Sequence, residues 1–237
     1  MNIGKISLPQ TLLTRKIQII VIGCGGTGSQ VVSLLARLHL ALLANGHPFG
    51  LNVKVYDPDR VSEANVGRQL FYSGDVGKPK ADVLVRRINF AFALQWQFET
   101  EEYHGGRTVS ADFLIGCVDS IRSRKKIYAR EGATFLIDCG NGSHYGQVLL
   151  AAPGGASLRE LAPELFRSGE EPPDDGPSCS LAEALTKQEL LVNDFAARIA
   201  VQMIWNLLRH GEINFNAVFY NLNTMTMRKC FQPKERK

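Results

Sequence analysis

The sequence predicts an α/β fold of the Rossmann-like, doubly wound type, with a mostly parallel sheet and an antiparallel C-terminal extension. Short apolar runs rich in Ile and Val alternate with segments whose apolar residues recur at helical spacing. A glycine-rich turn, Gly23-x-Gly25-x-x-Gly28, directly follows the first run, residues 17–22, and opens a helix. Strands that alternate with helices favour right-handed crossovers and therefore parallel pairing.

The first half of the chain carries the clearest signals. Helical spacing predicts a helix from Thr27 to about residue 44, which Asn45-Gly46 ends. Residues 51–56 are expected to return as a strand. Further elements are expected in this order: a helix from Lys80 to about Phe92, a strand at 95–103, a strand at 112–118, a helix at 120–131 and a strand at 133–139.

The second half departs from simple alternation. Residues 145–151 follow the preceding strand after only GNGSH, too short for a crossover, so antiparallel pairing is expected. Residues 153–178 are rich in proline and acidic residues and predict a long loop, with one helical turn around Leu158–Leu165. A long amphipathic helix is expected at 188–209 and a hairpin at 217–231.

Length and composition favour one domain. The 237 residues, with 45% hydrophobic and 21% charged residues, are typical of a globular chain with a full core. We divide it into four parts: an N-terminal lead-in (1–16), a nucleotide-binding core (17–150), a crossover-type loop (153–180), and a C-terminal helix and hairpin (181–237).

Charge and cysteine content narrow the class of protein. The net charge of +4 favours an anionic ligand or an acidic partner slightly, but it does not indicate nucleic-acid binding. The five cysteines include no C-x-x-C pair, so neither a disulfide framework nor a zinc site is expected. No signal peptide and no apolar run of membrane-spanning length is recognised, so a cytoplasmic location is the default expectation.

The glycine loop predicts a phosphate site. Gly23, Gly25, Gly26 and Gly28 leave room for backbone N–H groups to approach phosphate oxygens at a helix N-terminus, although such a loop also occurs as a purely structural turn. Asp57 ends the next strand, where an acid can accept hydrogen bonds from ribose hydroxyls or serve as a turn residue. It lies 29 residues after Gly28 rather than about 20, which weakens a dehydrogenase interpretation.

Two cations distinguish phosphate chemistry from hydride transfer. A dehydrogenase needs no Arg68 and no Lys80 beside the nucleotide, whereas attack on a phosphate builds charge that fixed cations must meet. Gln69 and Asn65 can add neutral donors. The alternative is that Arg68 and Lys80 are solvated loop charges. Asp59 is balanced between a turn role and a site role.

Two later residues complete the candidate set. Asp119 follows a third strand at the same sheet edge, where it can hold Mg²⁺ or cap the next helix. Cys179 stands where the acidic loop meets a helix, so it is either a nucleophile or an incidental thiol. The cysteines in or beside strands, Cys24, Cys117 and Cys139, are expected to belong to the core.

Together these segments resemble the ThiF/MoeB superfamily, which includes the activating enzymes for ubiquitin and ubiquitin-like proteins, and within it the plasmid-associated PRTRC-type ThiF proteins. The resemblance is firm over 17–150 and looser over 177–209. The matching pieces are G-C-G-G-T-G-S at 23–29, D-P-D-R-V-S-E-A-N-V-G-R-Q at 57–69, G-K-P-K at 77–80 and C-V-D-S-I-R-S-R at 117–124.

The resemblance implies ATP-dependent adenylation of the C-terminal carboxylate of a small ubiquitin-fold or sulfur-carrier protein, in a homodimer. It assigns the phosphates to the glycines, the ribose to Asp57, and Mg²⁺ to Asp119. It assigns the triphosphate and its transition state to Asn65, Arg68, Gln69 and Lys80, and a thioester or persulfide step to Cys179. Members often carry two zinc-binding C-x-x-C pairs and an N-terminal R-Y-x-R-Q. This chain has neither, only Arg15 in LLTRK.

Two other interpretations remain open on the sequence. One is a non-catalytic nucleotide-binding adaptor of the same fold, in which Cys179 is dispensable. The other is an NAD(P)-dependent oxidoreductase, in which Arg68 and Lys80 have no role. No nucleic-acid or membrane partner is expected.

Overall fold

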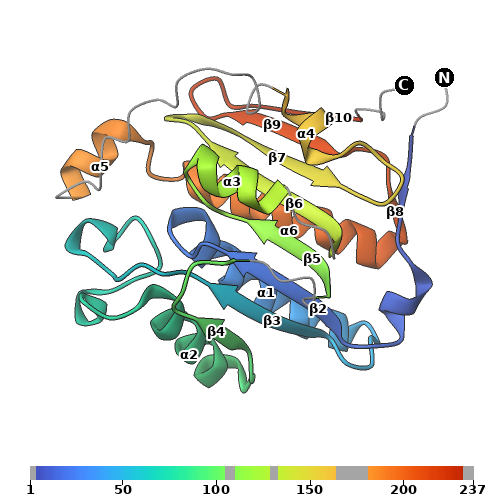
Figure 1. The fold of residues 1–237 in the computed structure, drawn as a ribbon, viewed down its shortest axis with the longest axis horizontal. Coiled ribbons are helices and arrows are strands. Elements are labelled where there is room, and N and C mark those ends of the chain that lie inside the picture. The colour runs from blue at the N-terminus through green and yellow to red at the C-terminus, as the bar shows by residue number, and fades with distance from the viewer. Residues whose placement is uncertain (1–3, 105–109, 129–132, 164–180, 232–237) are drawn as a thin grey trace.

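The computed structural model describes residues 4–104, 110–128, 133–163 and 181–231 (Figure 1). Its centre is an eight-stranded sheet. The strands are β2 (Ile17–Ile22), β3 (Leu51–Tyr56), β4 (Gln97–Glu99), β5 (Ala111–Gly116), β6 (Ala133–Asn141), β7 (Tyr145–Ala151), β9 (Ala217–Asn221) and β10 (Thr226–Cys230). A separate two-stranded sheet pairs β1 (Ile6–Ser7) with β8 (Glu212–Ile213).

The strand order confirms the predicted fold class. It runs β10-β9-β7-β6-β5-β2-β3-β4, and the five strands from β6 to β4 are parallel. The strands β7, β9 and β10 extend the sheet through antiparallel pairs. Every residue of β5 is buried, as expected for a central parallel strand covered on both faces. The rings of Phe113 and Phe135 stack across β5 and β6, 4.9 Å apart.

Helices cover both faces of the sheet. They are α1 (Gly26–Ala44), α2 (Lys80–Phe92), α3 (Ile121–Tyr128), α4 (Leu158–Leu161), α5 (Leu181–Lys187) and α6 (Val192–His210). Single 3₁₀ turns are η1 (Gln10–Leu13), η2 (Glu63–Asn65) and η3 (Ser73–Asp75). In Figure 1, α1 and α6 lie behind the sheet and α3 lies in front of it, so the fold is doubly wound.

Several elements differ from the sequence-based expectation. The strand expected at 95–103 is only Gln97–Glu99, because its neighbour β3 ends at Tyr56, opposite Glu99. The helix expected from 188 begins at Val192, since the Glu189 N–H donates to the Ser143 carbonyl instead of entering a helix. The lead-in, to which no element was assigned, contains β1 and η1. The helix expected where the acidic loop ends is α5, which is separate from α6.

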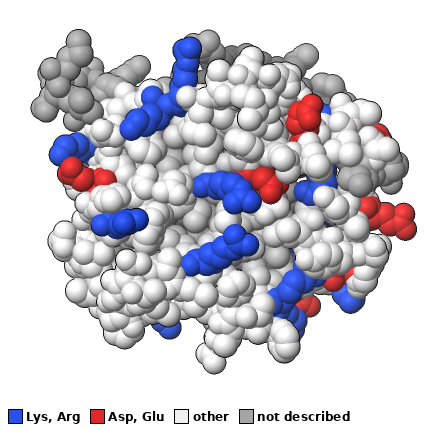
Figure 2. All heavy atoms as spheres, turned by 180° about the vertical axis from the view of Figure 1, so that it is seen from behind, with Lys and Arg blue, Asp and Glu red and all other residues white. Residues whose placement is uncertain are grey.

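The helix α1 corrects a further expectation. It is long and apolar enough to cross a membrane by length and hydropathy alone, although no such run was recognised in the sequence. Half of it is buried, and its apolar side includes Val31, Leu35 and Leu38 in the main core. A core helix passes the same test, so this feature is weak evidence for a membrane. Figure 2 shows the face behind the sheet as largely uncharged, with scattered Lys and Arg side chains.

Candidate functional site

One cavity lies where the order of the strands in the sheet reverses. The chain leaves β2 toward β3 on one side and later returns as β5 on the other. Such a switch point opens a crevice outside the carboxyl ends of the strands. Here that crevice is a cavity of about 360 Å³, lined by residues that follow β2, β3 and β5 and by residues of β6.

The glycine loop forms one wall and ends at the N-terminus of α1. Gly23 has a φ of +84°, and a Cβ there would lie 2.9 Å from the Cys117 carbonyl oxygen. Gly25 and Gly26 also line the cavity. Gly28 does not line it, which differs from its expected role. A Cβ on Gly28 would lie 1.9 Å from the Gly23 carbonyl oxygen, so this glycine lets α1 pack closely on its own loop.

Asp57 joins the glycine loop to the end of β3. Its Oδ2 accepts a hydrogen bond from the Cys24 backbone N–H at 2.5 Å, and its Oδ1 accepts one from the Asp59 N–H at 2.8 Å. Burial raises the pKa of this carboxyl above its ordinary value, and these hydrogen bonds and Lys80 oppose the shift. Asp57 therefore fixes the loop as well as lining the cavity.

Lys80 is a buried cation with one exposed partner. It is the first residue of α2, and its side chain is 9% exposed. The Nζ lies 2.9 Å from Asp59 Oδ2, while the Asp59 side chain is 62% exposed. Both residues line the cavity. Because water stabilises Asp59 on its own, the carboxylate can leave Lys80 to an anionic ligand at small cost.

Arg68 and Gln69 line the cavity, and each has one buried polar atom without a hydrogen-bond partner. The Arg68 Nη1 donates to Gln188 Oε1 at 3.0 Å, but its buried Nε has no hydrogen-bond partner. The Gln69 Oε1 is likewise buried without a partner, and its amide faces Gly25. Burial lowers the pKa of Arg68, and the charge of Asp119 opposes the shift. Buried polar atoms normally have partners, so these two indicate a ligand.

Asn65 is placed differently from its expected role. It does not line the cavity. Its Oδ1 accepts a hydrogen bond from the Ser62 backbone N–H at 3.0 Å, which caps η2. The side chain therefore shapes the loop before Arg68.

Asp119 lines the cavity and is solvent-exposed. It is a carboxylate beside a cavity whose lining also includes the cations Arg68, Lys80, Arg124 and Lys126. Mg²⁺ typically takes one or two carboxylates together with substrate phosphates. Asp119 thus fits a magnesium ion that arrives with a nucleotide. Within the described residues, no group of three or more His, Cys, Asp and Glu side chains is placed to hold a metal.

Two buried cysteines near the cavity, Cys24 and Cys139, are poor nucleophiles. Burial raises the pKa of Cys24 well above its ordinary value. The pKa of Cys139 is also raised, first by its hydrogen bond with Cys117 and then by burial. Cys24 and Cys139 belong to the main core, and Cys117 packs against it. The expected nucleophile Cys179 lies outside the described residues.

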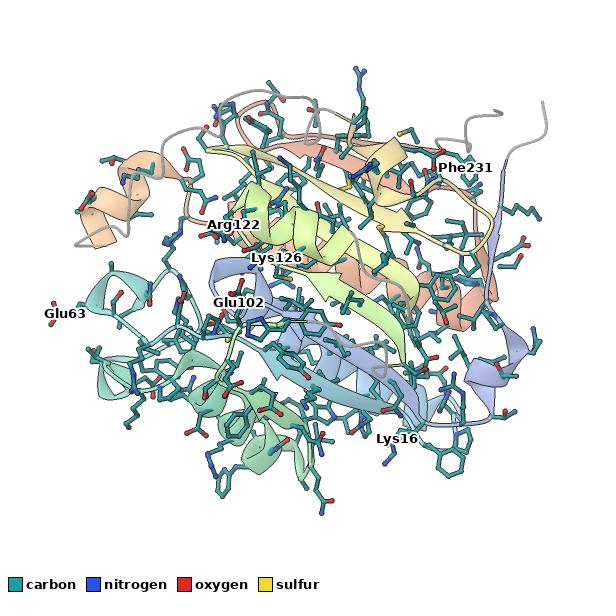
Figure 3. The ribbon with its side chains drawn as sticks, viewed as in Figure 1. Lys16, Glu63, Glu102, Arg122, Lys126 and Phe231 are labelled. Atoms are coloured by element: carbon teal, nitrogen blue, oxygen red, sulfur yellow. The ribbon has the colours of Figure 1, made fainter. Side chains whose placement is uncertain are left out.

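One part of the cavity lining was not recognised from the sequence. Lys126 on α3 donates to Glu102, which follows β4, at 2.5 Å, and Figure 3 shows the two side chains close together. Both line the cavity, together with apolar and aromatic residues: Ile22, Tyr56, Tyr103, Val118 and Ile127. This wall can take a flat base. Its residues come from separate segments of the chain, so no local sequence motif predicts this wall.

Arg15 lies at the opposite edge of the sheet. Its guanidinium makes two hydrogen bonds with Asp112 near the start of β5, at 2.7 and 2.5 Å. Asp112 also accepts from the Gln18 backbone N–H at 2.8 Å. Arg15 does not line the cavity of its own chain.

Comparisons with known proteins agree with this geometry. The chain is 36% identical over 136 residues to tRNA threonylcarbamoyladenosine dehydratase of Haemophilus influenzae, covering 54% of this chain and 48% of that protein. It is 27% identical over 183 residues to the NEDD8-activating enzyme E1 catalytic subunit of Saccharomyces cerevisiae, covering 70% and 56%. The chain thus spans about half the length of these two curated relatives.

Solved structures show the same fold. Escherichia coli MccB superposes with a TM-score of 0.65 at 16% identity, over 92% of this chain and 63% of MccB. A structure of MccB with ATP gives 0.62, and PaaA gives 0.61. The family model described as the ThiF family matches residues 1–237, which confirms the resemblance in the sequence motifs. The chain belongs to the ThiF family.

Proposed function

We propose that this protein binds ATP with Mg²⁺ in the cavity and adenylates the C-terminal carboxylate of a small ubiquitin-fold or sulfur-carrier protein. One observation carries the proposal: two buried or half-buried cations, Arg68 and Lys80, face a glycine-loop cavity, and the Arg68 Nε has no partner. The relatives named as activating enzymes and the ATP-bound MccB structure support the same chemistry.

Different residues of the cavity serve nucleotide binding and catalysis. A carboxylate oxygen of the carrier attacks the α-phosphorus, the bond to the β-phosphate oxygen breaks, and pyrophosphate leaves. Negative charge builds on the phosphoryl oxygens, where Arg68 and Lys80 stabilise it. Asp57 accepts hydrogen bonds from the ribose hydroxyls, and the glycine loop binds the phosphates. Asp119 would hold Mg²⁺, which supplies charge neutralisation on the phosphates.

Two further parts of the proposal rest on the family resemblance. Cys179 attacks the acyl adenylate as a thiolate, which forms a thioester and releases AMP, and the protein acts as a homodimer. The cytoplasmic location is a separate proposal, which rests on the default expectation from the sequence.

Ligand-dependent thermal stabilisation tests the proposed site. ATP with Mg²⁺ at a hundredfold excess over its Kd stabilises the native state by about 2.7 kcal/mol. We expect ATP–Mg²⁺ to raise the Tm, NAD and NADP to leave it unchanged, and Arg68→Ala to abolish the shift. The matched control is Arg60→Ala, since Arg60 lies outside the cavity lining. A shift with NAD alone would sink the proposal in favour of an oxidoreductase.

ATP–pyrophosphate exchange then tests catalysis. Each of a panel of purified ubiquitin-fold carriers is added to the protein, and one of them is expected to start exchange. If ATP binds but no carrier starts exchange, a nucleotide-binding adaptor replaces the enzyme.

The dehydratase relative supplies a second candidate substrate. Its name places its reaction on a tRNA nucleoside, and it is 36% identical over 136 residues. An exchange assay with tRNA in place of the carrier protein distinguishes the two substrates. Exchange started by tRNA and by no carrier would replace the protein substrate with a tRNA-borne carboxylate.

A further inference from the structure

A continuous hydrogen-bonded chain of side chains connects Arg68 with the first turn of α1. Arg68 Nη1 donates to Gln188 Oε1 at 3.0 Å. The Asn193 Nδ2 donates to the same oxygen at 2.9 Å. Asn193 Oδ1 in turn accepts from Thr27 Oγ1 and from Asn141 Nδ2, each at 3.0 Å. Gln188 lies between α5 and α6.

The direction of every bond in this chain follows from Arg68. A guanidinium only donates, so Gln188 must turn its oxygen toward it. That oxygen then requires the amide nitrogen of Asn193, and the Asn193 oxygen is left for Thr27. The Gln188 Nε2 donates to the Gly142 carbonyl oxygen at 3.1 Å, which leaves its amide only one orientation. The side chain of Gln188 is therefore fixed.

The chain also supports the glycine loop. A Cβ on Gly26 would lie 2.7 Å from Asn193 Cγ, so the Asn193 side chain packs directly behind the loop. Arg68, Thr27, Gln188 and Asn193 all line the cavity. One set of hydrogen bonds thus connects the two walls that face a phosphate.

Gln188 holds Arg68 without neutralising it. A carboxylate in its place would pair with the guanidinium and compete with phosphate for it. An amide oxygen fixes one nitrogen and leaves the full positive charge of the guanidinium for a ligand. Because burial already disfavours the charged guanidinium, this neutral acceptor matters more here than at a surface.

We propose that Gln188 is a positioning residue that aims Arg68 at the phosphates of ATP. It thereby makes nucleotide affinity depend on the placement of the α5–α6 junction. The inference rests on the proposed function, since it requires Arg68 to bind nucleotide phosphate. The helix α5 contacts η2, just before Arg68, so the same junction contacts the arginine loop at two points.

A double-mutant cycle tests it on the full chain. The Kd for ATP–Mg²⁺ is measured by calorimetry for wild type, Gln188→Met, Arg68→Ala and the double variant. We expect Gln188→Met to weaken binding by about tenfold when Arg68 is present, and by less than about twofold when it is absent. Gln202→Met, on the exposed side of α6, is the matched control and leaves the Kd unchanged.

The possible results are separable. An equal loss from Gln188→Met in both backgrounds overturns the positioning role and leaves the proposed function intact. If Arg68→Ala binds ATP as tightly as the wild-type protein, both the positioning role and the proposed function are overturned. If Gln188→Met does not fold, Gln188→Asn replaces it in the same cycle, since it keeps a neutral amide but is one methylene shorter between Arg68 and Gly142. The positioning role predicts weaker ATP binding for Gln188→Asn only when Arg68 is present, whereas a purely structural role predicts the same change with and without Arg68.

Discussion

Two aspartates at opposite ends of β5 have opposite surroundings. Asp112, at the start of the strand, is buried and accepts two hydrogen bonds from Arg15 and one from the Gln18 backbone. Asp119, beyond the end of the strand, is exposed and makes no hydrogen bond with another described residue. The amino edge of the sheet satisfies its charges within the fold, whereas the carboxyl edge leaves polar atoms open to a ligand.

The cations follow the same division. Arg15 is fully engaged by a carboxylate, and the pairing holds the N-terminal segment to the sheet. Arg68 is held by a neutral amide, and Lys80 by a carboxylate that water also stabilises. A cation that serves the fold has a buried partner of opposite charge. A cation that serves a ligand has a partner that leaves its positive charge available.

Removing Lys80 should have the largest effect on activity and a small effect on stability. We expect Lys80→Met to lower the rate of ATP–pyrophosphate exchange by about 10²–10³-fold, the usual loss for one donor to a developing charge. The apo Tm should stay close to that of wild type, because the abandoned Asp59 is solvated. Lys78→Met is the control, since Lys78 is exposed and outside the cavity lining. An unchanged rate in Lys80→Met would remove Lys80 from the mechanism.

Removing Asp112 should lower the stability and leave ATP binding unchanged. We expect Asp112→Ala to lower the free energy of unfolding by about 1–3 kcal/mol, because the Gln18 N–H loses its acceptor and Arg15 its partner. Arg15 is half exposed, which keeps the loss below that of a fully buried pair. Urea unfolding measures it, with Asp82→Ala as an exposed-pair control expected to lose less than about 1 kcal/mol. A changed Kd for ATP in Asp112→Ala would contradict the division between the two edges.

Acidification should affect the carboxyl edge through Asp57. Burial raises its pKa in the free protein, so it becomes protonated at a higher pH than its ordinary value of 3.8 predicts. An ionised carboxylate accepts hydrogen bonds from ribose hydroxyls better than a protonated carboxyl group does. Below the raised pKa, the Kd for adenosine should therefore increase by up to about tenfold per pH unit.

Calorimetry against pH checks this prediction, with adenosine as the probe because it has no phosphate. The adenine base also protonates at acidic pH, so Asp57→Asn is the control and should keep only the part of the pH dependence that comes from the base. A midpoint at or below 3.8 in the wild-type protein would show that hydrogen bonding, not burial, dominates at Asp57.

The fold was largely predictable because its signals are local. The apolar runs of β2 and β3 and the helical spacing of α1 and α2 are each complete within one segment. The start of α6 and the length of β4 were wrong because distant neighbours decide them. Ser143 binds the chain at Glu189, and the end of β3 stops the pairing of β4.

The candidate site was predictable only in part, for the same reason. Arg68 and Lys80 belong to motifs that can be read from the chain, and both line the cavity. Gln188 was missed because its partner Arg68 is 120 residues away. The Glu102–Lys126 pair was missed because it joins segments 24 residues apart with no motif between them.

The bond between Asp57 and the Cys24 backbone has a consequence for ligand design. One carboxylate both fixes the phosphate loop and lies where the proposed nucleoside half would bind. The two halves of a nucleotide are then not independent fragments. A nucleoside that orders Asp57 also orders the loop for phosphate, and a pyrophosphate-like fragment prepares Asp57 in return. Fragments of the two kinds should therefore bind more tightly together than the product of their separate affinities, even without a covalent linker.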